Sequence, residues 1–173
     1  MHNKAAGGGV FTIQCHDAMG NFKWEAVSHN LVVNVGLQDM NAKYFTGSGY
    51  TAAWYLGLWG AAASNTPAAT DTMTSHPGWT EFTSYLSATR PAAVFSGATA
   101  ASPSTISNAA APASFTISGA GGTVGGAFLT TSNVKGGTAG LLFSGSDFAA
   151  PGDRSAIAGD IITLVYTFSL TPT

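Results

Sequence analysis

The segment Ile161-Ile162-Thr163-Leu164-Val165-Tyr166-Thr167-Phe168-Ser169-Leu170 decides the fold class. Successive side chains of a β-strand point to opposite faces, so every second residue of this segment shares a face. One face is apolar and consists of Ile162, Leu164, Tyr166, Phe168 and Leu170. The other face is smaller and rich in hydroxyl groups, which is typical of a half-exposed sheet surface. The alternation therefore predicts a long C-terminal strand with one face in a core.

Further strands are expected along the rest of the chain. Residues 10–15 and 22–27 flank a turn and predict an N-terminal hairpin. Shorter strands are expected at 53–59, 81–85, 92–96, 113–118, 123–131 and 141–144. Their spacing is typical of a sandwich or barrel. Residues 97–112 are expected to form a long loop, and residues 71–76 a single helical turn capped by Asp71.

One helix is predicted, over residues 31–45. Its apolar residues recur at helical spacing, at Val33, Leu37, Met40 and Tyr44. Asn30 or Asn34 is expected to cap its first turn. The predicted fold is thus mainly β: an antiparallel β-sandwich, or jelly-roll-like barrel, with one helix. Residues 1–9, which include three glycines, are expected to be a flexible N-terminal arm, and residues 10–173 a single domain.

The low charge content excludes some classes of function. Of 173 residues only 14 are charged, 6 Lys+Arg and 8 Asp+Glu, and the net charge is −2. Nucleic-acid binding needs a basic surface, which six scattered basic residues do not provide. No run of about 20 apolar residues exists, so no membrane span is expected. A surface with so few charges favours a permanent partner or an oligomer.

Chemistry-bearing residues form no recognisable motif. Cys15 is the only cysteine, so it has no internal disulfide partner, and no histidine stands at metal-ligand spacing from it or from another histidine. The glycine-rich run 119–126 lacks the lysine of a phosphate-binding loop and predicts a tight turn instead. We therefore expect no enzyme activity, no catalytic or cofactor-binding residues, no metal and no cofactor. The chain also opens without a secretory signal pattern, so synthesis and assembly in the cytoplasm are expected.

The aromatic residues Trp54, Tyr55, Trp59 and Trp79 are the candidate contacts for a partner or a glycan. Sugars stack on exposed aromatic faces. On a strand, Trp54 and Tyr55 point to opposite sides, so one of the two faces of this segment is expected to be core. The leading interpretation of these residues is packing in the core or at a subunit interface, and glycan contact is the alternative.

Several strings together resemble the head decoration, or cement, proteins of tailed bacteriophages. They are 28–37 (SHNLVVNVGL), 54–59 (WYLGLW), 78–81 (GWTE) with Tyr85, 89–92 (TRPA), 125–129 (GGAFL) and 159–167 (GDIITLVYT). The resemblance covers residues 22–170 and its motifs are structural, so no catalytic residue is carried over.

This resemblance implies a β-sandwich or jelly-roll virion protein, often a homotrimer, on the exterior of a capsid. Its partner would be the major capsid protein, whose lattice it would cement after assembly in the host cytoplasm. The contact would involve the N-terminal arm or the loops at 60–70 and 97–112. The alternative function is a tail- or fibre-associated adhesin module that binds a host-surface glycan through exposed aromatics.

Overall fold

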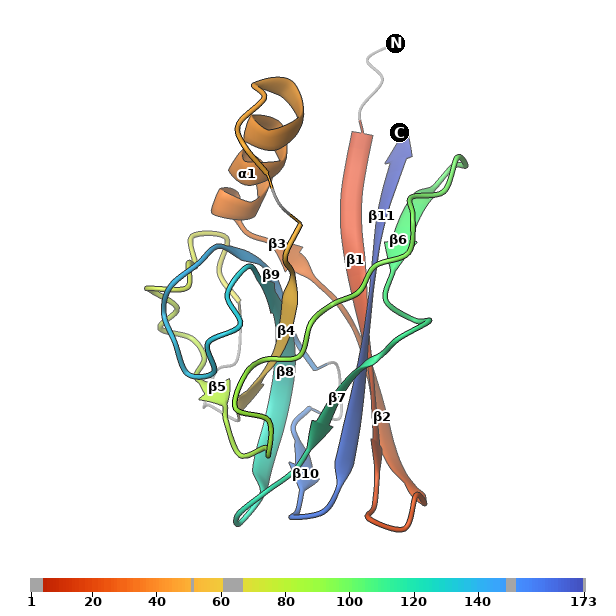
Figure 1. Cartoon of the computed structure of the whole chain (residues 1–173), viewed down its shortest axis with the longest axis vertical. Helices are drawn as coiled ribbons and strands as arrows, with labels where there is room; N and C mark the ends of the chain where they lie inside the picture. Colours follow the sequence, from red (N-terminus) through yellow and green to blue (C-terminus); the bar gives the residue numbers. More distant parts are fainter. Residues whose placement is uncertain (1–4, 51, 61–66, 149–151, 173) are drawn as a thin grey trace.

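The computed structural model describes residues 5–50, 52–60, 67–148 and 152–172. Two antiparallel sheets and one helix form the fold, so the predicted mainly β sandwich is confirmed (Figure 1). The elements are β1 (Ala5–His16), β2 (Phe22–His29), β3 (Leu31–Val32), α1 (Asn34–Phe45), β4 (Tyr55–Gly60), β5 (Glu81–Phe82), β6 (Ser104–Ser107), β7 (Ala113–Thr116), β8 (Gly122–Thr130), β9 (Leu142–Asp147), β10 (Arg154–Ala156) and β11 (Ile161–Pro172).

The C-terminal strand organises the first sheet. β11 pairs with β1 on one side, and β2 pairs with the far side of β1 as the predicted hairpin. On its other side β11 pairs with β6 near its end and with β7 near its beginning. The second sheet has the order β3-β9-β8-β4-β5, and β10 pairs with β8.

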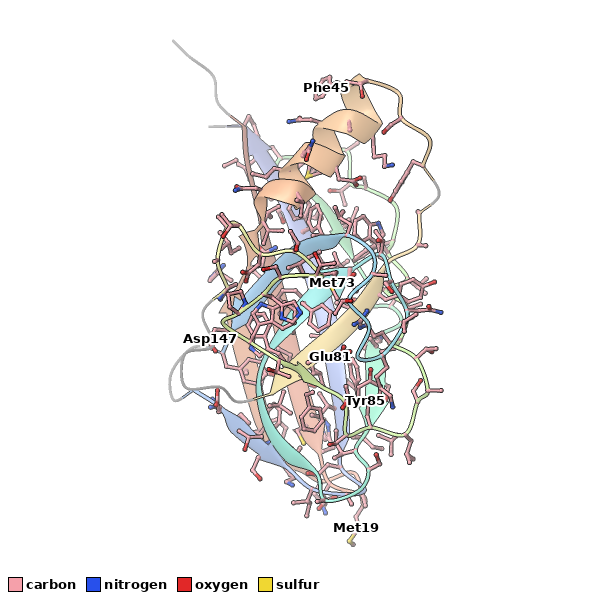
Figure 2. All side chains as sticks on the ribbon, turned by 90° about the vertical axis from the view of Figure 1, so that its left-hand side faces the viewer. Met19, Phe45, Met73, Glu81, Tyr85 and Asp147 are labelled. Atoms are coloured by element: carbon pink, nitrogen blue, oxygen red, sulfur yellow. The ribbon has the colours of Figure 1, made fainter. Side chains whose placement is uncertain are left out.

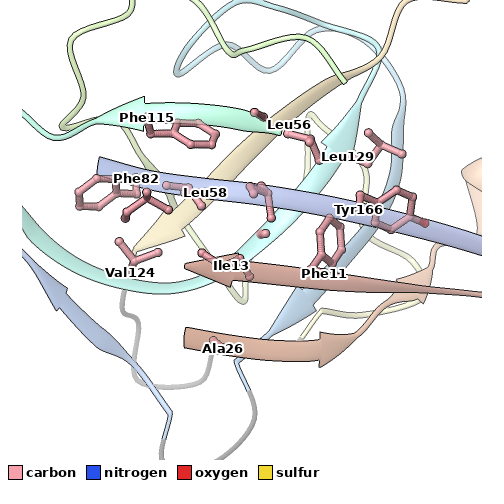
Figure 3. Close-up of a cluster of buried hydrophobic side chains, with 14 of the residues drawn as sticks. Phe11, Ile13, Ala26, Leu56, Leu58, Phe82, Phe115, Val124, Leu129 and Tyr166 are labelled. Atoms are coloured by element: carbon pink, nitrogen blue, oxygen red, sulfur yellow. The ribbon is translucent and has the colours of Figure 1, made fainter. Parts of the chain in front are cut away.

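The inner faces of the two sheets enclose the main core (Figure 3). Ile162, Leu164 and Tyr166 of β11 are fully buried, as their alternation predicts. Leu56 and Leu58 of β4 are fully buried on the opposite side. Removing these side chains from water is the main force that holds the sheets together.

Strand β1 begins earlier than the sequence suggests. It pairs with β11 from Ala5, opposite Pro172, to His16, so the predicted flexible arm is wrong for residues 5–9; residues 1–4 lie outside the described part of the chain. Gly9 allows close packing within the sheet. A Cβ on Gly9 would lie 2.5 Å from Tyr166 Oη, so the aromatic ring of β11 takes the space of the missing side chain.

Helix α1 begins at Asn34 rather than at residue 31, because Leu31 and Val32 pair with β9 as a short strand. Val33 occupies the cap position without a side-chain hydrogen bond, so the predicted asparagine cap is wrong. Asn30 accepts a hydrogen bond from Gly9 N–H and donates one to Tyr166 Oη instead. Gly36 is the fully buried residue of the helix, against the Phe143 carbonyl of β9, and Met40 packs partly against the main core. The end of the helix, with Tyr44 and Phe45, projects from the sandwich.

Two predicted loop conformations are also wrong. The predicted loop 97–112 contains strand β6, which is followed by the buried Asn108. The side-chain amide of Asn108 donates to Leu164 O and accepts from Tyr166 N–H, so it bonds the edge of β11 between β6 and β7. The predicted helical turn at 71–76 is a bridged turn, in which Asp71 accepts from Ala68 N–H and from Trp79 Nε1–H.

Some predicted strands are shorter than expected. The segment 81–85 is a strand only at β5, and Tyr85 forms an isolated bridge with Ile117. The segment 92–96 contributes only the bridge between Ala92 and Tyr55.

Candidate interaction surface

Between the projecting end of α1 and β4, side-chain hydrogen bonds tie residues 46–49 to the helix and Trp54 to Tyr50. Lys43 Nζ donates to Gly49 O at 2.8 Å, and Thr46 Oγ1 donates to Ala42 O at 2.8 Å. Trp54 Nε1 donates to Tyr50 Oη at 2.8 Å. The helix end and its return segment therefore form one bonded unit at the end of the sandwich.

Two neighbouring hollows lie between this unit and the inner faces of the sheets. The larger has a volume of about 480 Å³ and the smaller about 180 Å³. Both are lined by Met40, Tyr50, Trp54 and Phe143, and the ring of Trp54 packs edge-on against Phe143 at 5.4 Å between centroids. The larger hollow also reaches Leu170 at the end of β11.

The rim of the larger hollow is aromatic and exposed. Tyr44 is 83% exposed and Phe45 77%, with their rings edge to face at 4.9 Å. Figure 2 shows Phe45 at the tip of the molecule, opposite the end that carries Met19. We call the following residues the apolar end surface: Met40, Tyr44, Phe45, Tyr50, Trp54 and Leu170.

The electrostatics of the apolar end surface are weak. Asp39 and Lys43 are the charged residues that line its larger hollow, and they face each other at 3.8 Å. Clustered exposed aromatic groups mark protein–protein contacts, because each buries a large area at a low cost in side-chain entropy. This surface can therefore bind an apolar partner surface by excluding water.

Of the four aromatic residues that the sequence singles out, only Trp54 belongs to the apolar end surface. Tyr55 is half-buried on β4. Trp59 and Trp79 are 0% and 3% exposed, so the expectation that their faces meet a glycan or partner is wrong in this chain. Core packing, the leading interpretation, holds for these two residues.

Trp59 and Trp79 form a second buried cluster on the outer side of the β4–β8–β9 sheet. The Trp79 ring lies 4.9 Å from Trp59 and 5.0 Å from Phe128, and it stacks on His76 at 3.8 Å. Glycines leave room for these rings: a Cβ on Gly126 would overlap the Trp59 indole nitrogen, and one on Gly145 would lie 2.8 Å from Trp59 Cζ3. We call this set, with Met73, the Trp59 cluster.

A buried ion pair closes the Trp59 cluster on one side. Arg90 donates from Nε to Glu81 Oε1 at 2.9 Å and from Nη2 to Glu81 Oε2 at 2.7 Å. The same guanidinium donates to the carbonyls of Ser132 and Gly137, and it stands 5.2 Å from the centre of the Phe128 ring. Each guanidinium nitrogen has at least one partner, so the pair fixes the 132–137 loop against β5.

The chemistry-bearing side chains point to structural roles. Burial raises the pKa of the Cys15 thiol to about 11, with Asp160 adding to the effect, so the thiol stays protonated at neutral pH. Glu25 accepts a hydrogen bond from Gln14, and Glu81 is engaged by Arg90. Across the described residues, no three His, Cys, Asp or Glu side chains gather as metal ligands would.

Comparison with known proteins adds no relative: no protein-family model, no curated protein and no solved structure matches this chain. Within the described ranges, no helix is long and apolar enough to cross a membrane.

Sequence reasoning missed Tyr44, Phe45 and Tyr50 as surface residues. The helical spacing predicts Tyr44 on the apolar face together with Leu37, yet both are exposed, since the contacts of the helix with the sandwich come from Gly36 and Met40 and not from its last turn. The adjacent pair Tyr44-Phe45 at the end of the predicted helix is the available signal, because neighbouring helix residues lie about 100° apart and the two rings therefore point in different directions.

Proposed function

We propose that this protein is a non-enzymatic structural protein of a phage particle, which binds the outer capsid surface and stabilises the lattice of the major capsid protein. The apolar end surface is its contact with that lattice. The sequence resemblance to head decoration proteins supports the particle and the partner. The exposed aromatic rim supports the contact.

The observation that carries the binding function is the exposure of Tyr44, Phe45 and Tyr50 beside an apolar hollow of about 480 Å³. Leaving such groups in water is unfavourable, and a partner that covers them gains roughly 25 cal/mol per Å² of apolar area buried. A cement protein that binds only the assembled shell stabilises that shell by mass action, and many copies multiply the effect.

The first test is the copy number of the chain in purified virions, measured by quantitative mass spectrometry against the major capsid protein. We expect a ratio near one to one. A ratio of a few copies per hundred shell subunits would favour the alternative, a tail or fibre adhesin. Absence from particles would overturn both.

The second test is occupancy of decoration-free capsids by variants. The double substitution Tyr44→Ser and Phe45→Ser should reduce binding at least about tenfold, because two aromatic contacts are lost. Met19→Ser is the matched control, because Met19 is 86% exposed and lies at the opposite end of the molecule (Figure 2). This variant should bind capsids as the unmodified chain does. Equal loss in both variants would contradict the assigned contact.

Two further readouts separate the alternatives. A glycan array should show no binding, whereas glycan binding that Trp54→Ala abolishes would favour the adhesin. Sedimentation velocity measures the oligomeric state, for which the resemblance implies a homotrimer.

A further inference from the structure

One edge of the first sheet is left open next to β1. Strand β2 follows β1 only as far as Val10, whose partner is His29. The chain then turns at Asn30 into the second sheet, while β1 continues to Ala5 beside β11. Along Ala5–Gly8, the edge of β1 that pairs with β2 further along the strand has no partner strand among the described residues (Figure 1).

The hydrogen bonds of Gly9 show which main-chain groups face this unpaired edge. Its N–H donates to Asn30 Oδ1 at 2.6 Å, and its carbonyl accepts from Asn30 N–H at 2.9 Å. In an antiparallel ladder every second residue directs both groups to the same side. Gly7 therefore points its N–H and C=O away from β11, to the unpaired edge of β1. Gly8 directs both groups to Ser169 of β11.

This edge also lacks the usual protection against strand pairing. Natural sheets shield their edges with charged side chains, prolines or bulges. The segment Ala5-Ala6-Gly7-Gly8 contains none of these, and Ala6, Gly7 and Gly8 are exposed. An unpaired edge of this kind is a template for another strand.

A hollow on the outer face of the sheet adjoins the open edge. Its volume is about 340 Å³, and its walls are residues 6–10 of β1, the His29–Asn30 turn and the hydroxyl groups of Thr167, Ser169 and Thr171. It exists because Gly8 has no side chain, and a Cβ placed there would have no atom within 4 Å. The volume lies in the range of sites that hold a bulky group.

We propose that this edge binds an extended segment of a partner protein as an additional antiparallel strand beside Ala5–Gly8. The partner's main chain bonds to the N–H and C=O of Gly7. Its residue opposite Gly8 is aromatic and fills the hollow, because an aromatic side chain on the neighbouring strand compensates a glycine at a sheet edge. The hollow of this site lies on the opposite face of the β1–β11 ladder from Leu170, the residue of the apolar end surface that pairs with Gly7, and the proposal does not depend on the proposed function.

The hollow distinguishes such a partner from a second copy of this chain. Two copies paired edge to edge would bring only alanine and glycine side chains from Ala5–Gly8, and the space over Gly8 would stay empty. The wall, which is lined by Thr and Ser residues and by no Lys, Arg, Asp or Glu, fits an aromatic residue flanked by small or β-branched residues.

The test selects binders from a yeast-displayed library of random linear peptides, with the full chain as bait. Gly7→Pro removes the outward N–H without taking a bond from the β11 ladder, which an edge position tolerates. Gly7→Ala is its matched control, since it adds a Cβ at the same place, 3.1 Å from the movable Leu170 Cδ2, and keeps the N–H. Gly8→Val fills the hollow. Thermal unfolding of each variant checks that it folds. If Gly7→Pro does not fold, the binding of Gly8→Val decides whether the proposal holds.

We expect enriched peptides to share an aromatic residue within a β-forming stretch. Their affinity should fall at least about tenfold for Gly7→Pro and Gly8→Val, and stay within about twofold for Gly7→Ala. Hydrogen exchange should show new protection at the Gly7 amide and no change at Gly8. The proposal is overturned if no peptide is enriched or if Gly7→Pro binds as Gly7→Ala does. Dimerisation that Gly7→Pro abolishes, without peptide binding, would also overturn it in favour of pairing between copies.

Discussion

The Trp59 cluster and the apolar end surface are built from the same residue types with opposite outcomes. Trp59 is fully buried and Trp79 nearly so, while Tyr44 and Phe45 are largely exposed. The difference lies in the neighbours. Glycines at 126 and 145 make room for Trp59, whereas the end of α1 has no facing sheet against which its rings could pack. Whether an aromatic residue of this chain lies in the core or on a contact surface thus depends on the backbone opposite it.

The largest expected effect comes from closing the space around Trp59. Gly126→Ala places a Cβ on the Trp59 indole nitrogen and near the Ser146 carbonyl, in a β8 strand paired on both sides. We expect the free energy of unfolding to fall by about 3 kcal/mol or more, as measured by urea denaturation. Gly97→Ala is the control, because a Cβ there has no atom within 4 Å; equal losses would contradict the packing argument.

The ion pair beside the Trp59 cluster gives the next effect. Glu81→Gln leaves the buried Arg90 guanidinium without its countercharge. Breaking one partner of a buried pair costs roughly 3 kcal/mol, and we expect a loss of that size in the free energy of unfolding. Glu25→Gln, which alters an exposed hydrogen bond to Gln14, should stay within about 0.5 kcal/mol. A small change for Glu81→Gln would mean that water reaches Arg90.

The buried thiol of Cys15 in the core of the sandwich also predicts a pH dependence of stability. The folded state raises the pKa of Cys15 from 9.0 to about 11, so it holds the thiol proton more tightly than the unfolded chain does. Stability from this group is fully present below about pH 9 and is lost as pH rises through about 11, by roughly 3 kcal/mol in total. Burial also raises the pKa of Tyr85 and Tyr166, which steepens the alkaline loss.

The Cys15→Ala variant isolates the thiol's share of this loss. Its free energy of unfolding should fall less steeply between pH 9 and 11 than that of the unmodified chain, whatever its stability at pH 7. The measurement is urea denaturation over that pH range. Parallel curves for the two proteins would show that Cys15 does not titrate in the folded core.

The smallest stability effect is expected at the apolar end surface. Tyr44→Ser with Phe45→Ser should change the free energy of unfolding by no more than about 0.5 kcal/mol per residue, because both side chains are mostly in water. Thermal unfolding checks this. A loss comparable to that of Glu81→Gln would show that the helix end packs on the sandwich, and would end its assignment as a contact surface.

Much of the fold was predictable from local pattern. Alternation in β11 and in the β1–β2 hairpin depends on residues close in sequence, and both elements are present where the pattern places them. The helix start was not predictable, because Leu31 and Val32 pair with Ser144 and Gly145, which lie more than a hundred residues away. Tertiary pairing overrides the local helix signal at these positions.

The candidate site was less predictable than the fold. Trp54 was identified from sequence, but Trp59 and Trp79 look equally eligible until their neighbours are known. The open edge at Gly7 was hidden, since a glycine run favours a flexible arm when no partner strand is visible. Only its pairing with Phe168–Pro172 turns it into a strand with one unpaired side.

The sequence by itself determined that the chain forms a mainly β sandwich with few charges, because strand alternation and charge content are properties of neighbouring residues and of composition. The tertiary structure decided which aromatic residues are core, where β1 begins and which edge stays open. These depend on pairs far apart in the chain, such as Gly126 with Trp59 and Gly9 with Tyr166, in which a missing side chain on one strand makes room for a ring from another.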